Sequence, residues 1–110
     1  MEKITINLPV EKKYLPSIRL FTASIATNMN FDIEKIEDMR VLISEAVNYK
    51  KEKTTIQINY CIQEDTLTIE VIGKDKEIDE ERKNMRDLIL KELSDKVEVR
   101  KNAIILINKV

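Results

Sequence analysis

The chain has 110 residues, of which 35% are charged, and its 19 basic and 20 acidic residues give a net charge of −1. This length predicts one domain, residues 1–110, with a core large enough to fold without disulfides. The balanced charge disfavours a nucleic-acid-binding surface, which needs a basic excess. Because the chain has no histidine, Ser–His and Cys–His catalysis and histidine-ligated metal sites are excluded.

The cysteine content and the hydropathy of the chain indicate its cellular setting. Cys61 is the only cysteine, so no internal disulfide forms and a reducing compartment is favoured. There is no signal peptide and no long apolar run, and we therefore expect a cytoplasmic protein without a membrane partner. With only one glycine, the chain has almost nothing from which to build a glycine-rich phosphate loop.

The first half of the chain reads as one strand followed by two helices. Apolar and polar residues alternate over Ile4–Leu8, which predicts a strand that ends at Pro9. Apolar residues then recur at helical spacing from Leu15 to about Met29, and Pro16 suits the first turn of that helix. The link to the next helix is short, so the two helices should be antiparallel neighbours.

The second helix is predicted over Phe31–Tyr49. Asp32 is a suitable N-cap, and Phe31 and Ile36 have the spacing of a hydrophobic staple. The apolar face repeats at steps of three and four residues and consists of Ile33, Ile36, Met39, Ile43, Ala46 and Val47.

The second half reads as a hairpin, a helix and two further strands. After a solvated connection at Lys50–Lys53, alternating residues on both sides of Glu64-Asp65 predict a β-hairpin. A third helix is predicted over roughly Asp79–Leu93, with apolar residues that include Met85 and Leu88.

A strand around Val97–Val99 is followed by the nearly continuous apolar run Ala103–Ile107. That run predicts a central strand buried on both faces, or a strand at a subunit contact. The element order is β-α-α-β-β-α-β-β. This order predicts an α+β two-layer sandwich, with a mostly antiparallel sheet and the three helices on one face.

Glu45 and Asn48 are the first candidate site residues. They lie three residues apart near the end of the second helix, so they point the same way. A carboxylate and an amide in this arrangement can orient water or hold a hydrated magnesium ion. The alternative is a polar stripe that faces solvent, which is the commoner case.

The same helix carries a family resemblance. It is similar to the N-box helix of the bacterial anti-sigma factor/serine protein kinase family, within the histidine-kinase-like (GHKL) ATPases, and this implies a GHKL-like fold. The matching residues are Ile36-Glu37-Asp38-Met39-Arg40 and Ser44-Glu45-Ala46-Val47, with Tyr14, Ile18-Arg19-Leu20 and Ile25-Ala26 upstream.

Members of this family hold ATP and magnesium with three sequence motifs, and the first is the N-box Glu-x-x-x-Asn. Glu45 matches its glutamate, whereas Tyr49 occupies the asparagine position and Asn48 comes one residue early. A step of one residue turns a side chain by about 100° around a helix. Glu45 is therefore expected to be a vestigial catalytic residue, and Asn48 a vestigial cofactor-binding residue.

The second motif is an Asp-x-Gly-x-Gly loop that follows the hairpin. Gly73 stands where the resemblance places the adenine-reading aspartate, and Asp75 and Glu77 stand at the two glycine positions. Two added carboxylates would repel a triphosphate. Gly73 and Asp75 are therefore expected to be remnants of a cofactor site.

The third motif is a flexible lid with a glycine turn. Asn84 and Arg86 lie near its glycine positions, and the third helix is predicted to run through the place of the lid. The sequence therefore predicts no cofactor and no resident metal, with ATP and magnesium as the alternative.

Three functions are compatible with these residues. The first is a non-catalytic, anti-sigma-like binding module whose partners are a sigma factor, a small anti-sigma antagonist or both. For this function Arg19 matches an arginine that the family uses toward partners. The alternative is a serine/threonine protein kinase with weak activity through Glu45. The third is a structural homodimer that pairs strands Ile4–Leu8 and Ala103–Ile107 across subunits.

Overall fold

The computed structural model describes residues 1–110 and contains the predicted helices and strands in the predicted order. Only the short 3₁₀ turn at Lys12–Tyr14 was not predicted. The elements are β1 (Glu2–Pro9), α1 (Leu15–Asn28), α2 (Ile33–Asn48), β2 (Thr55–Gln63), β3 (Thr66–Ile72), α3 (Glu80–Leu93), β4 (Lys96–Arg100) and β5 (Ala103–Lys109).

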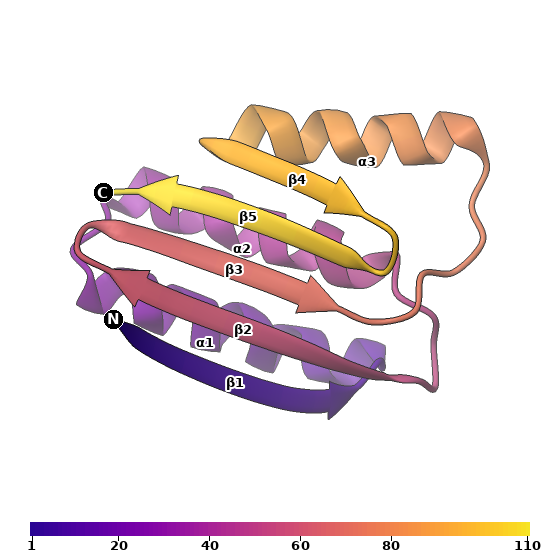
Figure 1. The fold of residues 1–110 in the computed structure, drawn as a ribbon, viewed down its shortest axis with the longest axis horizontal. Helices are drawn as coiled ribbons and strands as arrows, with labels where there is room; N and C mark the ends of the chain where they lie inside the picture. The colour runs from indigo at the N-terminus through magenta and orange to yellow at the C-terminus, as the bar shows by residue number, and fades with distance from the viewer.

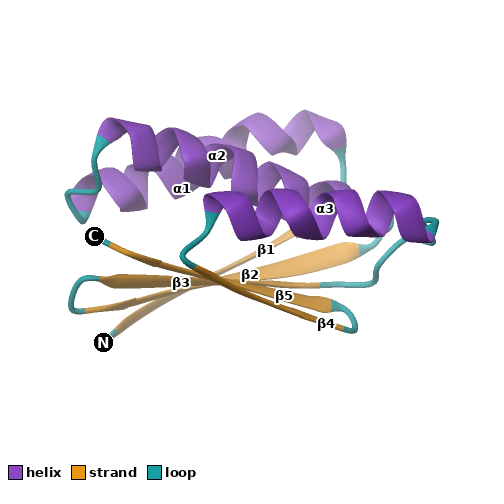
Figure 2. Ribbon diagram, turned by 90° about the horizontal axis from the view of Figure 1, so that it is seen from above, coloured by secondary structure: helices purple, strands orange, loops and turns teal.

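The strands form one five-stranded sheet in the order β1-β2-β3-β5-β4, and every neighbouring pair is antiparallel. All three helices lie on the same face of this sheet (Figure 2). In the view of Figure 1, α1 and α2 lie behind the sheet, while α3 runs alongside β4 at its edge. The predicted α+β two-layer sandwich is therefore confirmed. None of its helices combines the length and the apolar character that a bilayer crossing requires.

The core fills the space between the sheet and the helices. Along the strands, alternate side chains point to the helices, and the register aligns Tyr60 with Ile69 and Ile69 with Leu106, all fully buried. From the predicted face of α2, the buried residues are Met39, Ile43, Ala46 and Val47. These residues close a single apolar cluster between the two layers.

The ends of α2 differ slightly from the prediction. Asp32 is the N-cap, as predicted, and its carboxylate accepts a hydrogen bond of 2.8 Å from the Lys35 backbone amide. Phe31 is buried and Ile36 packs against the same core, as a hydrophobic staple requires. The helix covers Ile33–Asn48 rather than Phe31–Tyr49, because Phe31 precedes the cap and Tyr49 has left the helical conformation.

The predicted apolar face of α3 is partly wrong. Met85 and Leu88 are 56% and 55% exposed, whereas Arg86 is buried. The reason is the position of α3 at the edge of the sheet, where it packs on α2 and covers little of the core. Its C-terminal end is held by Lys35, whose Nζ donates to the Leu93 carbonyl at 3.2 Å and to Asp95 at 3.2 Å.

The prediction that β5 is buried on both faces is also wrong. Its buried residues alternate with half-buried ones such as Ile105 and Ile107, because no layer covers the second face of the sheet. Since β5 pairs with β3 on one side and β4 on the other, it has no free edge to pair with another subunit. Of the two strands proposed for a homodimer, only β1 has a free edge.

A buried hydrogen bond joins the two layers at the centre of the core. The Thr22 and Tyr60 hydroxyls are 2.7 Å apart, and the Thr22 hydroxyl also lies 2.9 Å from the Ile18 carbonyl, to which it can donate. The Phe21 ring meets Tyr60 edge-to-face at 5.3 Å. Burial raises the pKa of Tyr60 from 10.0 to about 12, although the hydrogen bond to Thr22 opposes this shift.

The raised pKa of Tyr60 predicts a loss of stability at alkaline pH. Above pH 10 the unfolded chain releases the phenol proton while the folded chain retains it, so unfolding is favoured until about pH 12. Over that interval, the raised pKa of Tyr60 should lower the free energy of unfolding by about 1.4 kcal/mol per pH unit. Tyr60→Phe should be about 1 kcal/mol less stable than wild type at pH 9, from the lost hydrogen bond, and should equal or exceed it at pH 11. Urea unfolding at both pH values tests this, and an unchanged difference would contradict it.

Candidate functional site

The end of α2 is joined to the segment that follows β3. The Lys51 amide donates to the Lys74 carbonyl at 2.7 Å, and the Lys76 amide donates to the Tyr49 carbonyl at 3.0 Å. These bonds form an isolated antiparallel bridge between Lys50 and Asp75. The structure thus places the two sequence segments that the resemblance singled out, the end of the N-box helix and the loop after the hairpin, side by side.

A buried ion pair lies at this junction. The Lys50 side chain is completely buried, and its Nζ donates to Asp75 Oδ1 at 2.7 Å and to the Gly73 carbonyl at 3.1 Å. The predicted solvated connection is therefore wrong at Lys50. The sequence carries no signal for this, because Lys50 belongs to a run of charged residues whose other members are exposed.

The turn between β4 and β5 completes the junction. Asn102 accepts a hydrogen bond from the Gly73 amide through its carbonyl at 2.9 Å, and one from the Asp75 amide through its Oδ1 at 3.2 Å. The Asn102 amide donates in turn to Asp75 Oδ2 at 3.1 Å. Both carboxylate oxygens of Asp75 are therefore engaged within the protein, one by Lys50 and one by this turn.

Gly73 is required by close packing. A β-carbon at this position would lie 2.5 Å from Cγ2 of Ile56, a distance that side chains do not reach without a shift. Ile56 is fully buried in β2, so it has little room to move. The geometry therefore assigns Gly73 a packing role against the sheet.

Tyr49 and Arg86 connect α2 to α3. The guanidinium carbon of Arg86 lies 5.4 Å from the centre of the Tyr49 ring, and Lys76 Nζ lies 5.9 Å from it. Arg86 is only 4% exposed, and its charge is paired with Asp87 through Nη2–Oδ1 at 2.9 Å. The space between the two helices at this end is thus filled by an aromatic ring and a buried cation.

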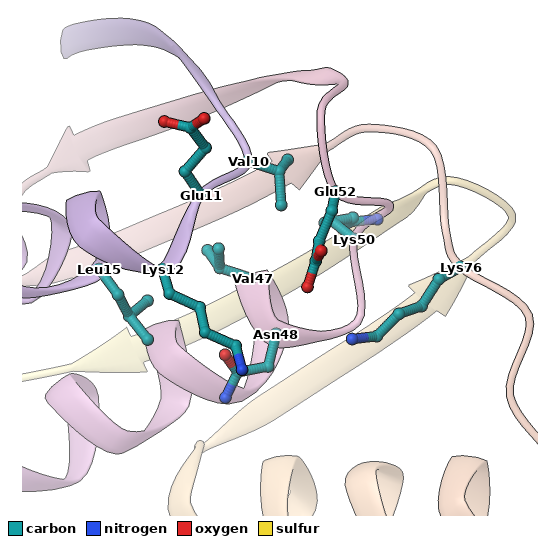
Figure 3. A pocket seen from close by; sticks show the side chains of 9 residues that line it. All are labelled: Val10, Glu11, Lys12, Leu15, Val47, Asn48, Lys50, Glu52 and Lys76. Carbon is teal, nitrogen blue, oxygen red and sulfur yellow. The ribbon is translucent and has the colours of Figure 1, made fainter.

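Asn48 and Asp75, both expected to be remnants of a cofactor site, line different hollows of the surface. Asn48 is exposed and lines a hollow of about 300 Å³ beside Lys12 (Figure 3). Asp75 lines a different hollow, of about 580 Å³, on the side of α3. Glu45 is half-buried, makes no ion pair, and lines neither of these two hollows.

Figure 3 shows how mixed the charges around Asn48 are. Lys12 and Asn48 lie at one end of this hollow, and Glu52 and Lys76 reach it from the loops at the other end. The structure contains no group of three or more acidic or cysteine side chains that could together hold a metal ion.

Arg19 lies where the first two helices cross. It is half-buried, and its Nη1 donates to the Ser44 hydroxyl at 3.2 Å, while that hydroxyl donates to the Arg40 carbonyl. Arg19 thus ties α1 to α2 and remains partly exposed to solvent. Its use toward a partner stays a prediction.

The ion pair at the junction predicts an asymmetric effect of its two partners on stability. Asp75→Asn leaves a buried ammonium without a counter-charge and should lower the free energy of unfolding by about 2 kcal/mol. Lys50→Met removes the buried charge and leaves a partly exposed carboxylate that still binds Asn102, so it should cost less than about 1 kcal/mol. Urea unfolding followed by circular dichroism measures both values.

The exposed pair between Arg100 and Glu98 provides a matched control, because its atoms are also 2.7 Å apart. Glu98→Gln should change stability by no more than about 0.5 kcal/mol. Equal costs for Asp75→Asn and Lys50→Met would show that the buried charge does not govern the junction.

Comparison with known proteins places the chain among named relatives, although no protein-family model matches it. The serine-protein kinase RsbW of Bacillus cereus (strain Q1) is 38% identical over 76 residues, which cover 64% of this chain and 48% of that protein. The proteins of the same name from Bacillus mycoides (strain KBAB4) and Listeria monocytogenes serovar 1/2a are 37% and 34% identical over 76 and 77 residues. The chain spans about half the length of these relatives. It is therefore a relative of the RsbW serine-protein kinases, and the family resemblance seen in its sequence is confirmed.

Proposed function

We propose that this chain is an anti-sigma-factor-like regulatory module that acts by binding proteins and neither binds ATP nor transfers phosphate. The observation that carries this proposal is the buried pair of Lys50 and Asp75. It occupies the junction where the resemblance locates the nucleotide site. Because this ion pair binds the polar groups of the junction to one another, those groups are not free to bind a nucleotide.

The backbone donors of the loop are the first support for this function. Phosphate loops bind their ligand through free backbone amides. Here the amides of Gly73 and Asp75 donate to Asn102, and the amide of Lys76 donates to the Tyr49 carbonyl. A phosphate would have to break these bonds before it could be bound by the same amides.

The side chains of the loop are the second support. The adenine-reading aspartate of the resembled motif has no room at position 73, because even a β-carbon would meet Ile56 at 2.5 Å. The glycine positions carry Asp75 and Glu77, whose negative charge opposes a triphosphate. Adenine recognition and phosphate binding are therefore both disfavoured.

The start of α3 is the third support. The N-terminus of a helix attracts phosphate through its free amides. In α3 the Asp79 carboxylate caps the helix by accepting from the Arg82 amide at 2.8 Å, and Glu80 and Glu81 follow in the first turn. This helix end is already provided with negative charge.

The helical layer offers surface for protein partners. Arg19 has a planar guanidinium that can pair with a carboxylate through two hydrogen bonds. Nearby in sequence, Leu20 leaves a large apolar side chain 65% exposed on the same helix. We take a sigma factor, a small anti-sigma antagonist or both as the partners, in the cytoplasm.

A second candidate function is an ATP-dependent serine/threonine protein kinase. The names of the relatives favour it, and Glu45 is half-buried and unpaired, as a catalytic base would be before substrate binds. The two candidates differ in one measurable property, which is nucleotide binding.

ATP with magnesium at millimolar concentration should not raise the melting temperature of this chain. Thermal unfolding tests this, and the Bacillus cereus relative named serine-protein kinase RsbW serves as the reference in the same buffer. A binding protein gains stability once the ligand concentration exceeds the dissociation constant. A clear rise in melting temperature, together with radiolabelled phosphate transfer that Glu45→Gln abolishes, would establish the kinase instead.

Partner capture should depend on Arg19. Wild-type chain used as bait in a lysate of the native host should retain a sigma factor or an antagonist, and Arg19→Glu should retain several-fold less, since a reversed charge repels a carboxylate. Arg82→Glu, an exposed charge reversal on α3, is the matched control and should retain as much as wild type. Retention of neither kind of protein by the wild-type chain would contradict the proposed function.

A further inference from the structure

A groove runs between α3 and the free edge of β4, away from the junction described above. Its lining residues on the helix follow steps of three and four and so share one face of α3. The groove has a volume of about 390 Å³ and is lined by Asn84, Asp87, Leu88, Lys91, Val97 and Val99. Leu88 is 55% exposed and Val99 is 39% exposed, so the groove leaves large apolar side chains in solvent.

The sheet ends at β4, which pairs only with β5. The other edge of β4 therefore presents backbone groups without a strand partner. In Figure 1, α3 lies beyond this free edge over most of its length, and Figure 2 shows it on the helix side of the sheet. A sixth strand, about 4.8 Å from β4, would thus run beneath α3.

We propose that this groove binds an extended peptide segment of a partner protein, which adds to β4 as a sixth antiparallel strand. Backbone hydrogen bonds to β4 supply affinity, and alternate side chains of the peptide supply specificity. The side chains that point to the helix layer are apolar, because they meet Leu88, Val97 and Val99.

The opposite face of β4 determines the charge of the peptide. Lys96, Glu98 and Arg100 alternate along this face as basic, acidic and basic residues. Side chains directly opposite in an antiparallel pair interact, and like charges there are destabilising. The matching peptide therefore carries an acidic, a basic and an acidic residue at alternate positions, separated by apolar ones, as in Glu-Val-Lys-Val-Glu.

A second copy of the chain fits this edge poorly. In the register that pairs all of β4 with itself, Glu98 faces Glu98 and Lys96 faces Arg100, so like charges meet. The two-fold axis that keeps both helical layers on one side would also bring two copies of α3 over one seam. A single strand without a helix of its own avoids both conflicts.

The test uses the whole chain and two short synthetic peptides, each with one tryptophan. Because the chain contains no tryptophan, the fluorescence reports the peptide alone. The peptide that contains Glu-Val-Lys-Val-Glu should bind at least about tenfold more tightly than its charge-reversed version Lys-Val-Glu-Val-Lys. In bound samples, hydrogen exchange should slow at β4 amides and not at β1 amides.

Three variants sharpen the test. Leu88→Asp should weaken binding of the first peptide about tenfold or more, and Ile33→Asp, which places the same charge on exposed Ile33 of α2, should not change it. Glu98→Lys should change the preference toward a peptide that carries acidic residues at all three positions.

Several results would overturn the inference. These are no binding at about 1 mM peptide, equal affinity for both peptides, and wild-type affinity in Leu88→Asp. A concentration-dependent mass in light scattering that Leu88→Asp abolishes would identify a second copy as the occupant and would also overturn it. The groove shares no residue with the Lys50–Asp75 junction, so these outcomes do not depend on whether the chain binds ATP.

Discussion

The ion pair between Lys50 and Asp75 is the constraint on which the loop end of the structure depends. An ammonium with no solvent contact is costly unless its hydrogen bonds and its charge are satisfied. Lys50 meets this condition only because the segment after β3 presents the Gly73 carbonyl and the Asp75 carboxylate together. The position of that segment is therefore coupled to the end of α2, and through Asn102 to the turn between β4 and β5.

This coupling leaves no need for a further glycine in the segment after β3. A loop that closes over a ligand needs residues that change conformation, and glycine supplies them at the lowest steric cost. The segment after β3 is instead fixed by backbone bonds at Lys74 and Lys76 and by the side chain of Asp75. Gly73 remains because Ile56 leaves no space for a side chain.

The fold was predictable from the sequence because its information is local. Periods of two and of 3.6 residues mark the strands and helices, and the cap at Asp32 fixes where α2 begins. The failures concern how elements meet in space. Periodicity shows that Met85 and Leu88 share a helix face with apolar neighbours, but it does not show that this face projects past the edge of a sheet.

The candidate site was less predictable for the same reason. The sequence pointed to Glu45, Asn48 and Asp75 through their positions in family motifs, and in the structure Asn48 and Asp75 line different hollows. The residue that organises the junction, Lys50, lies in a charged run that reads as solvated. Its burial depends on the carboxylate of Asp75, 25 residues later in the chain. The spacing of residues within one segment does not indicate such a distant partner.

The uninterrupted helix α3 has a second consequence for the molecule. By the resemblance, this part of the chain corresponds to a lid and a glycine turn, which would face a nucleotide. As a straight helix held near its middle by Arg86 and at its C-terminal end by Lys35, it instead lies along the edge of the sheet. At this edge, Leu88 of α3 and Val97 and Val99 of β4 line one groove. The polar groups of the junction are satisfied within the protein, whereas this edge of the sheet has no strand partner, and the contrast supports the proposal that the chain acts by binding proteins.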